Sequence, residues 1–194
     1  MSTASAPVLI PAAHVAAQPW RNGGGLTREL LTRPAGVSAW QLRISLAEVG
    51  SDGPFSRFPG VERWFSVIDG AGVRLGLPGQ DRLLTPGHEP LHFSGELPVT
   101  CTLIGGPTTD LNLMHTRGRA SMSLIRSGIA FRSPLAMRGV FTRVAGHWST
   151  PQAAPVHLPA HCLLWLDQAA DAPWTFHATN PAEPAPALAL AFAP

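Results

Sequence analysis

The chain has 194 residues, of which 45% are hydrophobic and 13% are charged, and its formal net charge is +2. This length allows one large domain or two small lobes sharing a core, and the apolar content excludes a chain that is disordered throughout. All 14 basic side chains are dispersed arginines, unlike the basic patch of a nucleic-acid-binding protein. No apolar stretch is long enough for a membrane helix, and residues 1–10 lack the features of a secretion signal. We therefore expect a cytoplasmic protein with neither nucleic acid nor membrane as a partner.

Alternation of apolar and polar residues predicts short strands along the whole chain. In residues 40–46 it separates Leu42 and Ile44 from Arg43 and Ser45, which share the opposite face. Around the Gly-rich turn at residues 69–72, it predicts a hairpin between residues 64–68 and 73–77. The other expected strands are 99–104, 111–114, 122–125, 140–144, 162–166 and 188–192.

Helix signals are poor, because proline or glycine interrupts nearly every window longer than ten residues. Residues 12–18 form the best short candidate. The Pro-rich segments 150–159 and 180–186 are expected to be loops, since proline cannot donate to a central ladder. Many short strands separated by glycine and proline turns favour a β-sandwich or a barrel.

Cysteines and histidines give no sign of a cofactor. Cys101 and Cys162 lie in apolar runs, which favours buried free thiols, although a disulfide between them is left open. His88 and His92 are four residues apart, but Pro90 between them argues against a regular element. We therefore predict no metal site and no cofactor, since a usable metal site needs three or four convergent ligands.

Three segments have unusual composition. Residues 20–29 (WRNGGGLTRE) contain three glycines whose backbone could approach an anion, although a plain turn is the alternative. In the second segment, a Pro59-Gly60 turn delivers Arg63 to the start of a strand, where it could fork onto a ligand carboxylate or pair with an internal acid. In the third, alternation places Asn112 and Met114 on one face, which suits a mixed polar and apolar pocket or a satisfied core asparagine.

Five segments in this order resemble the HutD/Ves family of the cupin superfamily. They are residues 20–29, 43–45, 53–63, 93–96 and 110–118, so the clear resemblance spans residues 14–120. The chain departs from the family pattern at His115-Thr116, where a second arginine before Arg117 is expected. The cupin metal pattern of two histidines and a glutamate followed by a third histidine is missing, in agreement with the absence of a predicted metal site.

The resemblance implies an all-β fold of the cupin (RmlC-like) β-barrel or jelly-roll type. It implies a bicupin, with a motif-bearing half over residues 1–120 and a degenerate half over residues 121–194. It also implies a non-catalytic, small-molecule-binding regulator of histidine utilisation, whose ligand is an acidic metabolite such as formylglutamate. The ligand-binding residues are then expected to be Trp20, Asn22, Gly23, Gly24, Gly25, Thr27, Glu29, Arg63, His92, Asn112 and Met114.

Two further hypotheses remain open at this stage. One is a metal-independent isomerase or epimerase that uses His92, Glu29 and Glu96 as acid and base. The other is a homodimer formed through exposed strand edges, which the low charge of the chain would favour.

Overall fold

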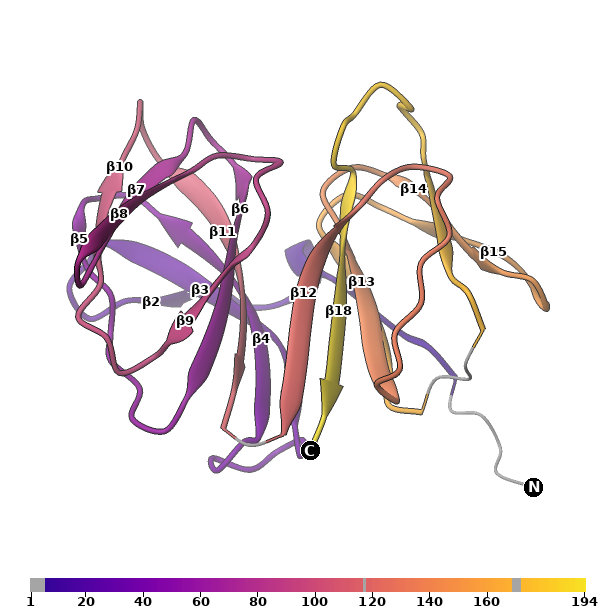
Figure 1. The fold of residues 1–194 in the computed structure, drawn as a ribbon, viewed down its shortest axis with the longest axis horizontal. Coiled ribbons are helices and arrows are strands. Elements are labelled where there is room, and N and C mark those ends of the chain that lie inside the picture. The colour runs from indigo at the N-terminus through magenta and orange to yellow at the C-terminus, as the bar shows by residue number, and fades with distance from the viewer. Residues whose placement is uncertain (1–5, 117, 169–171) are drawn as a thin grey trace. The chain divides into compact units, whose positions relative to one another are not determined.

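The computed structural model describes residues 6–116, 118–168 and 172–194, and these residues fold into β-strands (Figure 1). Within these ranges the only helix is a short 3-10 turn, η1 (Ala12–His14), so the predicted helix over residues 12–18 is mostly absent. None of the described helices is long and apolar enough to cross a membrane. The all-β class predicted from the sequence is confirmed.

The chain divides into two compact units, Val15–Arg117 and Met1–His14 together with Gly118–Pro194. The sequence-based division assigned residues 1–120 to one half. In the structure, however, strand β1 (Val8–Pro11) pairs with β16 (Cys162–Leu166), so this N-terminal strand belongs to the sheet of the second unit.

The Val15–Arg117 unit contains a six-stranded antiparallel sheet with the order β2-β3-β4-β11-β6-β9. Apolar residues of its central strands, such as Ile44 and Leu113, are fully buried on one face. Side chains on the other face alternate with them, because successive residues of a strand point to opposite sides. The strands are β2 (Gln18–Pro19), β3 (Gly25–Arg33), β4 (Leu42–Val49), β11 (Thr108–His115), β6 (Glu62–Asp69) and β9 (Leu91–Ser94).

A four-stranded sheet with the order β5-β10-β7-β8 completes this unit. A core cluster joins residues of both sheets, among them Phe65 and Phe93 from the first sheet and Leu75 and Cys101 from the second. This packing buries aromatic rings next to the polar face described below. The strands are β5 (Gly53–Pro54), β10 (Thr100–Leu103), β7 (Val73–Leu77) and β8 (Gln80–Leu84).

The predicted hairpin around residues 69–72 is wrong, although both of its strands exist. Strand β6 pairs with β11 and β9, whereas β7 pairs with β10 and β8 in the other sheet. Gly70 and Gly72 have φ angles of 96° and 125°, and a Cβ at either would lie 2.5 Å from a backbone oxygen. The turn therefore carries the chain from one sheet to the other, through positions that only glycine fills.

The second unit has a five-stranded sheet with the order β1-β16-β13-β18-β12 and a three-stranded sheet with the order β15-β14-β17. Its core includes Trp148, Phe176 and Cys162. Both cysteines of the chain are free and buried, which confirms the favoured prediction. The remaining strands are β13 (Met137–Thr142), β18 (Ala187–Ala193), β12 (Arg119–Ile125), β15 (Ala153–Leu158), β14 (Gly146–Thr150) and β17 (Thr175–Ala178).

The loop predicted over residues 150–159 is also wrong, because β15 occupies most of it. Among the described strands, β15 lies at the edge of its sheet and pairs with β14 alone. An edge position leaves one side of the backbone without ladder partners, and this is where a strand tolerates a residue such as Pro155. The segment over residues 180–186 contains no strand, as predicted.

Candidate functional site

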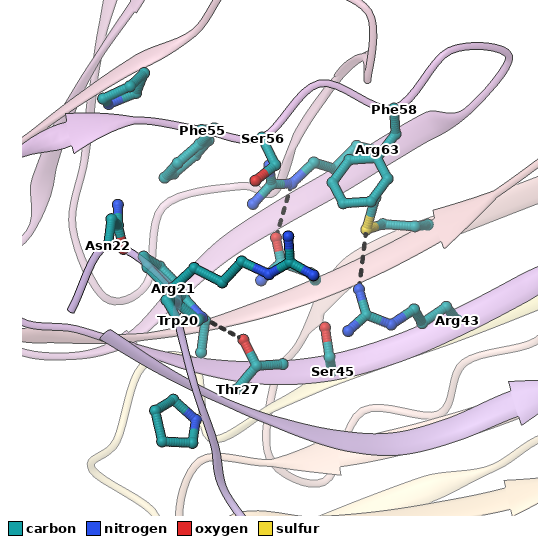
Figure 2. A pocket seen from close by; sticks show the side chains of 15 residues that line it. Trp20, Arg21, Asn22, Thr27, Arg43, Ser45, Phe55, Ser56, Phe58 and Arg63 are labelled. Atoms are coloured by element: carbon teal, nitrogen blue, oxygen red, sulfur yellow. Dashed lines mark hydrogen bonds between the residues drawn. The ribbon is translucent and has the colours of Figure 1, made fainter. Parts of the chain in front are cut away.

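A pocket of about 580 Å³ lies within the Val15–Arg117 unit, and Figure 2 shows the side chains around it. It combines three arginines with aromatic and small polar side chains, and the described residues that line it include no acidic side chain. The lining residues are Pro19, Trp20, Arg21, Asn22, Thr27, Arg43, Ser45, Ala47, Pro54, Phe55, Ser56, Phe58, Arg63, Asn112 and Met114.

The register of the six-stranded sheet places the polar side chains in rows. Met114 of β11 lies between Arg43 of β4 and Arg63 of β6 as their direct cross-strand partner. In the next row on the same face, Asn112 pairs with Ser45. Directly opposed residues of antiparallel strands project on the same side, so two arginines flank one methionine at the floor of the pocket.

Arg63 is buried, with 9% of its surface exposed. Its Nε donates a hydrogen bond of 2.8 Å to Asn112 Oδ1. Its guanidinium carbon lies 4.3 Å from the ring centre of Phe55, 5.7 Å from that of Phe65 and 5.6 Å from that of Phe93. Burial lowers the pKa of Arg63 to about 10, so the group is still a cation at neutral pH. No hydrogen bond joins its Nη atoms to the described residues, which leaves these donors for a ligand.

Asp110 is the acidic group that acts electrostatically on Arg63. It is fully buried, and its Oδ2 accepts a 3.0 Å hydrogen bond from Thr108 Oγ1. Its Oδ1 has no hydrogen-bond partner among the described residues. Burial raises the pKa of Asp110 to about 7, against the opposing effects of Thr108 and Arg63. The compensation of Arg63 by this carboxylate is therefore incomplete at neutral pH.

The second arginine of the row, Arg43, is held from outside the pocket. Its Nε lies 2.8 Å from Glu29 Oε2, and its Nη1 lies 4.0 Å from the sulfur of Met114. Glu29 is itself 42% exposed, so this ion pair is partly screened by solvent. Arg21 has neither an ion pair nor a hydrogen bond with the described residues, and it reaches into the pocket from the Gly-rich loop (Figure 2).

The Gly-rich loop forms one wall of the pocket. Trp20 Nε1 donates a 2.7 Å hydrogen bond to Thr27 Oγ1, and the Asn22 side chain accepts one of 3.1 Å from the Gly24 amide. A Cβ at Gly25 would lie 3.1 Å from the Trp20 ring and closer still to the Glu48 carbonyl. Gly25 therefore lets the indole approach the start of β3 closely, and the indole lines the pocket.

Six predicted site residues line this pocket, namely Trp20, Asn22, Thr27, Arg63, Asn112 and Met114. The other five lie outside its lining. Gly23, Gly24 and Gly25 shape the loop, and Glu29 forms an ion pair with Arg43. His92 stacks on Trp64 at 4.7 Å and pairs with Glu62 at 3.0 Å.

The acid–base residues considered for an enzyme are not brought together there. His92 is the cross-strand partner of Trp64, which alternates with Arg63 and so projects from the opposite face of the sheet. Trp64 is for the same reason absent from the pocket lining. Glu96 accepts a 2.7 Å hydrogen bond from the Gly60 amide, which fixes the turn before β6. His115 follows Met114 and does not line the pocket, and Arg117 is outside the described residues.

Sequence reasoning missed several pocket residues. Arg43 and Ser45 were separated correctly from the apolar face of their strand, and that alternation was a sufficient signal for both. Phe55, Ser56 and Phe58 follow the short β5, and no local pattern indicates which way such a segment faces. Arg21 is adjacent to two predicted residues and carries the charge that a ligand-facing loop would use.

Known relatives agree with this fold and this set of motifs. The HutD family model matches residues 12–183. An uncharacterized 21.2 kDa protein in the hutC 3′ region of Pseudomonas putida is 41% identical over 104 residues, which are 52% of this chain and 54% of that protein. The match thus spans about half the length of that relative. Protein Ves from Citrobacter koseri is 33% identical over 130 residues, 66% of this chain and 68% of that protein.

Solved structures extend the likeness to the whole fold. HutD from Pseudomonas fluorescens SBW25, in a formate condition, has a TM-score of 0.79 and 30% identity, and the match covers 97% of this chain and 100% of that one. A cupin 2 conserved barrel domain protein from Leptotrichia buccalis has a TM-score of 0.57 at 10% identity, covering 99% and 98%. The second likeness concerns the fold alone, and it confirms the predicted cupin type. Sequence and structure together show that the chain belongs to the HutD family.

Proposed function

We propose that this protein binds an acidic metabolite such as formylglutamate and thereby modulates histidine utilisation, without catalysing a reaction itself. The observation that carries the proposal is Arg63, a buried cation that lines the pocket and whose Nη donors meet no described acceptor. A guanidinium with two parallel donors matches the geometry of a carboxylate, and removal from water strengthens the pairing.

The surrounding side chains have distinct parts in this binding. Asn112 fixes the orientation of the guanidinium through Nε, so the fork is already aimed when a ligand arrives. Phe55 covers the guanidinium face at 4.3 Å and keeps water from the ion pair. Arg43 and Arg21, which are more exposed than Arg63, add positive charge, and Trp20 and Met114 provide apolar surface for the body of the ligand.

The link to histidine utilisation is supported by the relatives. The P. putida protein is named by its place beside hutC, and the P. fluorescens structure is named HutD. An acid–base enzyme, in contrast, would require groups such as His92 and Glu96 at the ligand, and neither lines the pocket. We therefore favour binding and regulation over catalysis.

Thermal unfolding with histidine, urocanate and formylglutamate tests this proposal. A ligand at 100 times its dissociation constant stabilises a protein by about 2.7 kcal/mol, which at this chain length raises the melting temperature by about 5–10 °C. We expect a selective rise with formylglutamate that is lost in Arg63→Ala and kept in Arg74→Ala, an exposed arginine of β7 outside the pocket. No rise with any of the three compounds would separate this chain from histidine catabolism.

A further inference from the structure

Three histidines stand side by side on the three-stranded sheet of the second unit. His147 of β14 is the direct cross-strand partner of His157 in β15 and also of His177 in β17. The chain has 8 histidines in 194 residues, and three of them thus form one continuous row. Figure 1 shows β14 and β15 next to each other in this sheet.

The row lies on the outer face of this sheet. The neighbours of His147 along its strand, Gly146 and Trp148, are buried, and Phe176 beside His177 is fully buried in the core cluster. All three histidines, in contrast, are exposed. Because directly opposed residues of antiparallel strands project on the same side, the three imidazoles share one surface.

The imidazoles make few contacts with the rest of the chain. The ring centres of His147 and His157 are 5.3 Å apart with planes at 71°. No hydrogen bond or ion pair joins any of the three rings to a described residue. Gly128 lies beside His177, where a Cβ would be in ordinary van der Waals contact with the ring at 3.7 Å. The ring nitrogens are therefore available to an external ligand.

The spacing of the row suits a transition-metal ion. Neighbouring strands are about 4.7–4.9 Å apart, and Zn–N bonds are about 2.0–2.1 Å long, so one ion can bridge histidines on adjacent strands. In the side-chain orientations of this structure, no group of three donors among the described residues is arranged to hold an ion. Rotation about the side-chain torsions of exposed histidines is needed to close the site, and such rotamer changes are fast at a protein surface.

We propose that His147 and His157 bind one divalent transition-metal ion, with His177 as a third ligand. Neutral imidazole favours Zn²⁺, Ni²⁺ and Cu²⁺, whereas Mg²⁺ and Ca²⁺ require oxygen ligands that this row does not provide. The central position makes His147 common to every pairing within the row. None of the three residues lines the carboxylate pocket, so metal binding and ligand binding are separate properties.

Calorimetric titration of the tag-free chain with ZnCl₂ and NiCl₂ at neutral pH tests the site, with MgCl₂ as the negative control. We expect one ion per chain for zinc and nickel and no binding of magnesium. His147→Gln should weaken binding more than about tenfold, and His157→Gln and His177→Gln by smaller factors. His14→Gln, which changes an exposed histidine outside the row, should leave the affinity unchanged.

Two results would overturn the proposal, namely no zinc or nickel binding by the wild-type chain and an unchanged affinity in His147→Gln. Full affinity in His177→Gln would remove that residue from the ligand set. Circular dichroism of each variant checks that the fold is retained, which is expected for substitutions at exposed positions.

Discussion

Arg63 and Arg138 are both buried against aromatic rings, one in each unit, and they differ in what their guanidinium groups meet. Arg63 lies 4.3 Å from the Phe55 ring centre, bonds to a side-chain amide through Nε and lines a pocket. Arg138 lies 4.5 Å from the Trp174 ring centre and donates from Nη2 to the Ala172 carbonyl at 3.1 Å. It is 2% exposed and is not part of the pocket lining.

The two arginines differ in which guanidinium nitrogen already has a hydrogen-bond partner, Nε in Arg63 and Nη2 in Arg138. A guanidinium whose terminal nitrogen is bonded to the backbone ties two segments of the chain together. One that is held only at Nε keeps its fork for an outside carboxylate. Under the proposed function, the same pairing of arginine with aromatic rings supports stability in one unit and ligand recognition in the other.

The largest expected effect is that substitution of Arg63 reduces ligand binding, whereas substitution of Arg138 reduces stability. Arg63→Ala should weaken carboxylate binding by about 2–5 kcal/mol and change the free energy of unfolding little, because removing a desolvated cation offsets the lost packing. Arg138→Ala should lower the free energy of unfolding by about 2–4 kcal/mol and leave the dissociation constant unchanged. Chemical denaturation and calorimetry on both variants measure the two effects. The comparison fails if Arg138→Ala abolishes binding while the chain is still folded.

Asn112→Ala tests whether the orientation of Arg63 matters. A hydrogen bond to a charged group contributes about 1.5–3 kcal/mol, and without it the guanidinium can turn away from the ligand. We expect binding to weaken by up to that amount, by calorimetry. Asn112→Asp would instead place a carboxylate against Arg63 and compete with the ligand, so it should bind more weakly than Asn112→Ala. Equal affinity of the wild type and Asn112→Ala would show that Nε needs no partner.

Asp110 should make both stability and binding depend on pH. Its pKa of about 7 in the folded chain lies above its ordinary 3.8, so the folded chain holds this proton more tightly than the unfolded chain does. The free energy of unfolding should therefore fall as pH rises from about 4 to about 7. Among the groups around Asp110, Arg63 with a pKa of about 10 and Cys101 with one of about 12 do not titrate in this range.

Carboxylate affinity should fall as pH rises above about 7, where Asp110 ionises in the folded chain and partly neutralises Arg63. A change of one pKa unit in Asp110 on ligand binding corresponds to about a tenfold change in affinity. Asp110→Asn should flatten both pH profiles, which denaturation and calorimetry at pH 5 and pH 8 would measure. A profile that keeps its slope in Asp110→Asn would assign the titration to another group.

Glu29→Gln should have the smallest effect. It releases Arg43 from its 2.8 Å ion pair. The positive charge of Arg43 is then no longer neutralised by Glu29, but the side chain loses the contact that orients it. The two consequences oppose each other, and exposed pairs contribute only about 0.2–1 kcal/mol. We expect a change in affinity below about threefold in Glu29→Gln. The control is Glu48→Gln, which breaks the similarly exposed pair with Arg28 outside the pocket. A tenfold loss in Glu29→Gln alone would make Glu29 a direct part of the site.

Local patterns were enough to find the face that carries the pocket. Period-two alternation placed Asn112 with Met114 and Arg43 with Ser45, and the Pro59-Gly60 turn placed Arg63 at the start of its strand. In each case the signal lies within a few residues, and the period of a strand converts it directly into a face.

The assembly of that face could not be predicted in the same way. Strand pairing joins segments far apart in the sequence, such as Asn112 of β11 with Ser45 of β4, and no local propensity encodes the partner. The turn at Gly70 and Gly72 resembles a hairpin turn but connects two sheets. Glu29 lies next to a register shift in β3, which determines how it reaches Arg43. The histidine row likewise depends on the pairing of β15, and Pro155 in this strand led to the prediction of a loop.

Calorimetric titration of formylglutamate into the wild-type chain and into Arg63→Gln tests the central claim most directly. The variant keeps a polar side chain of similar length but loses the charge and the fork. The account predicts saturable one-site binding to the wild type and at least about thirtyfold weaker binding to the variant, a loss of about 2 kcal/mol. Equal affinity of the two proteins would contradict it, because the ligand would then bind without the arginine on which this account depends.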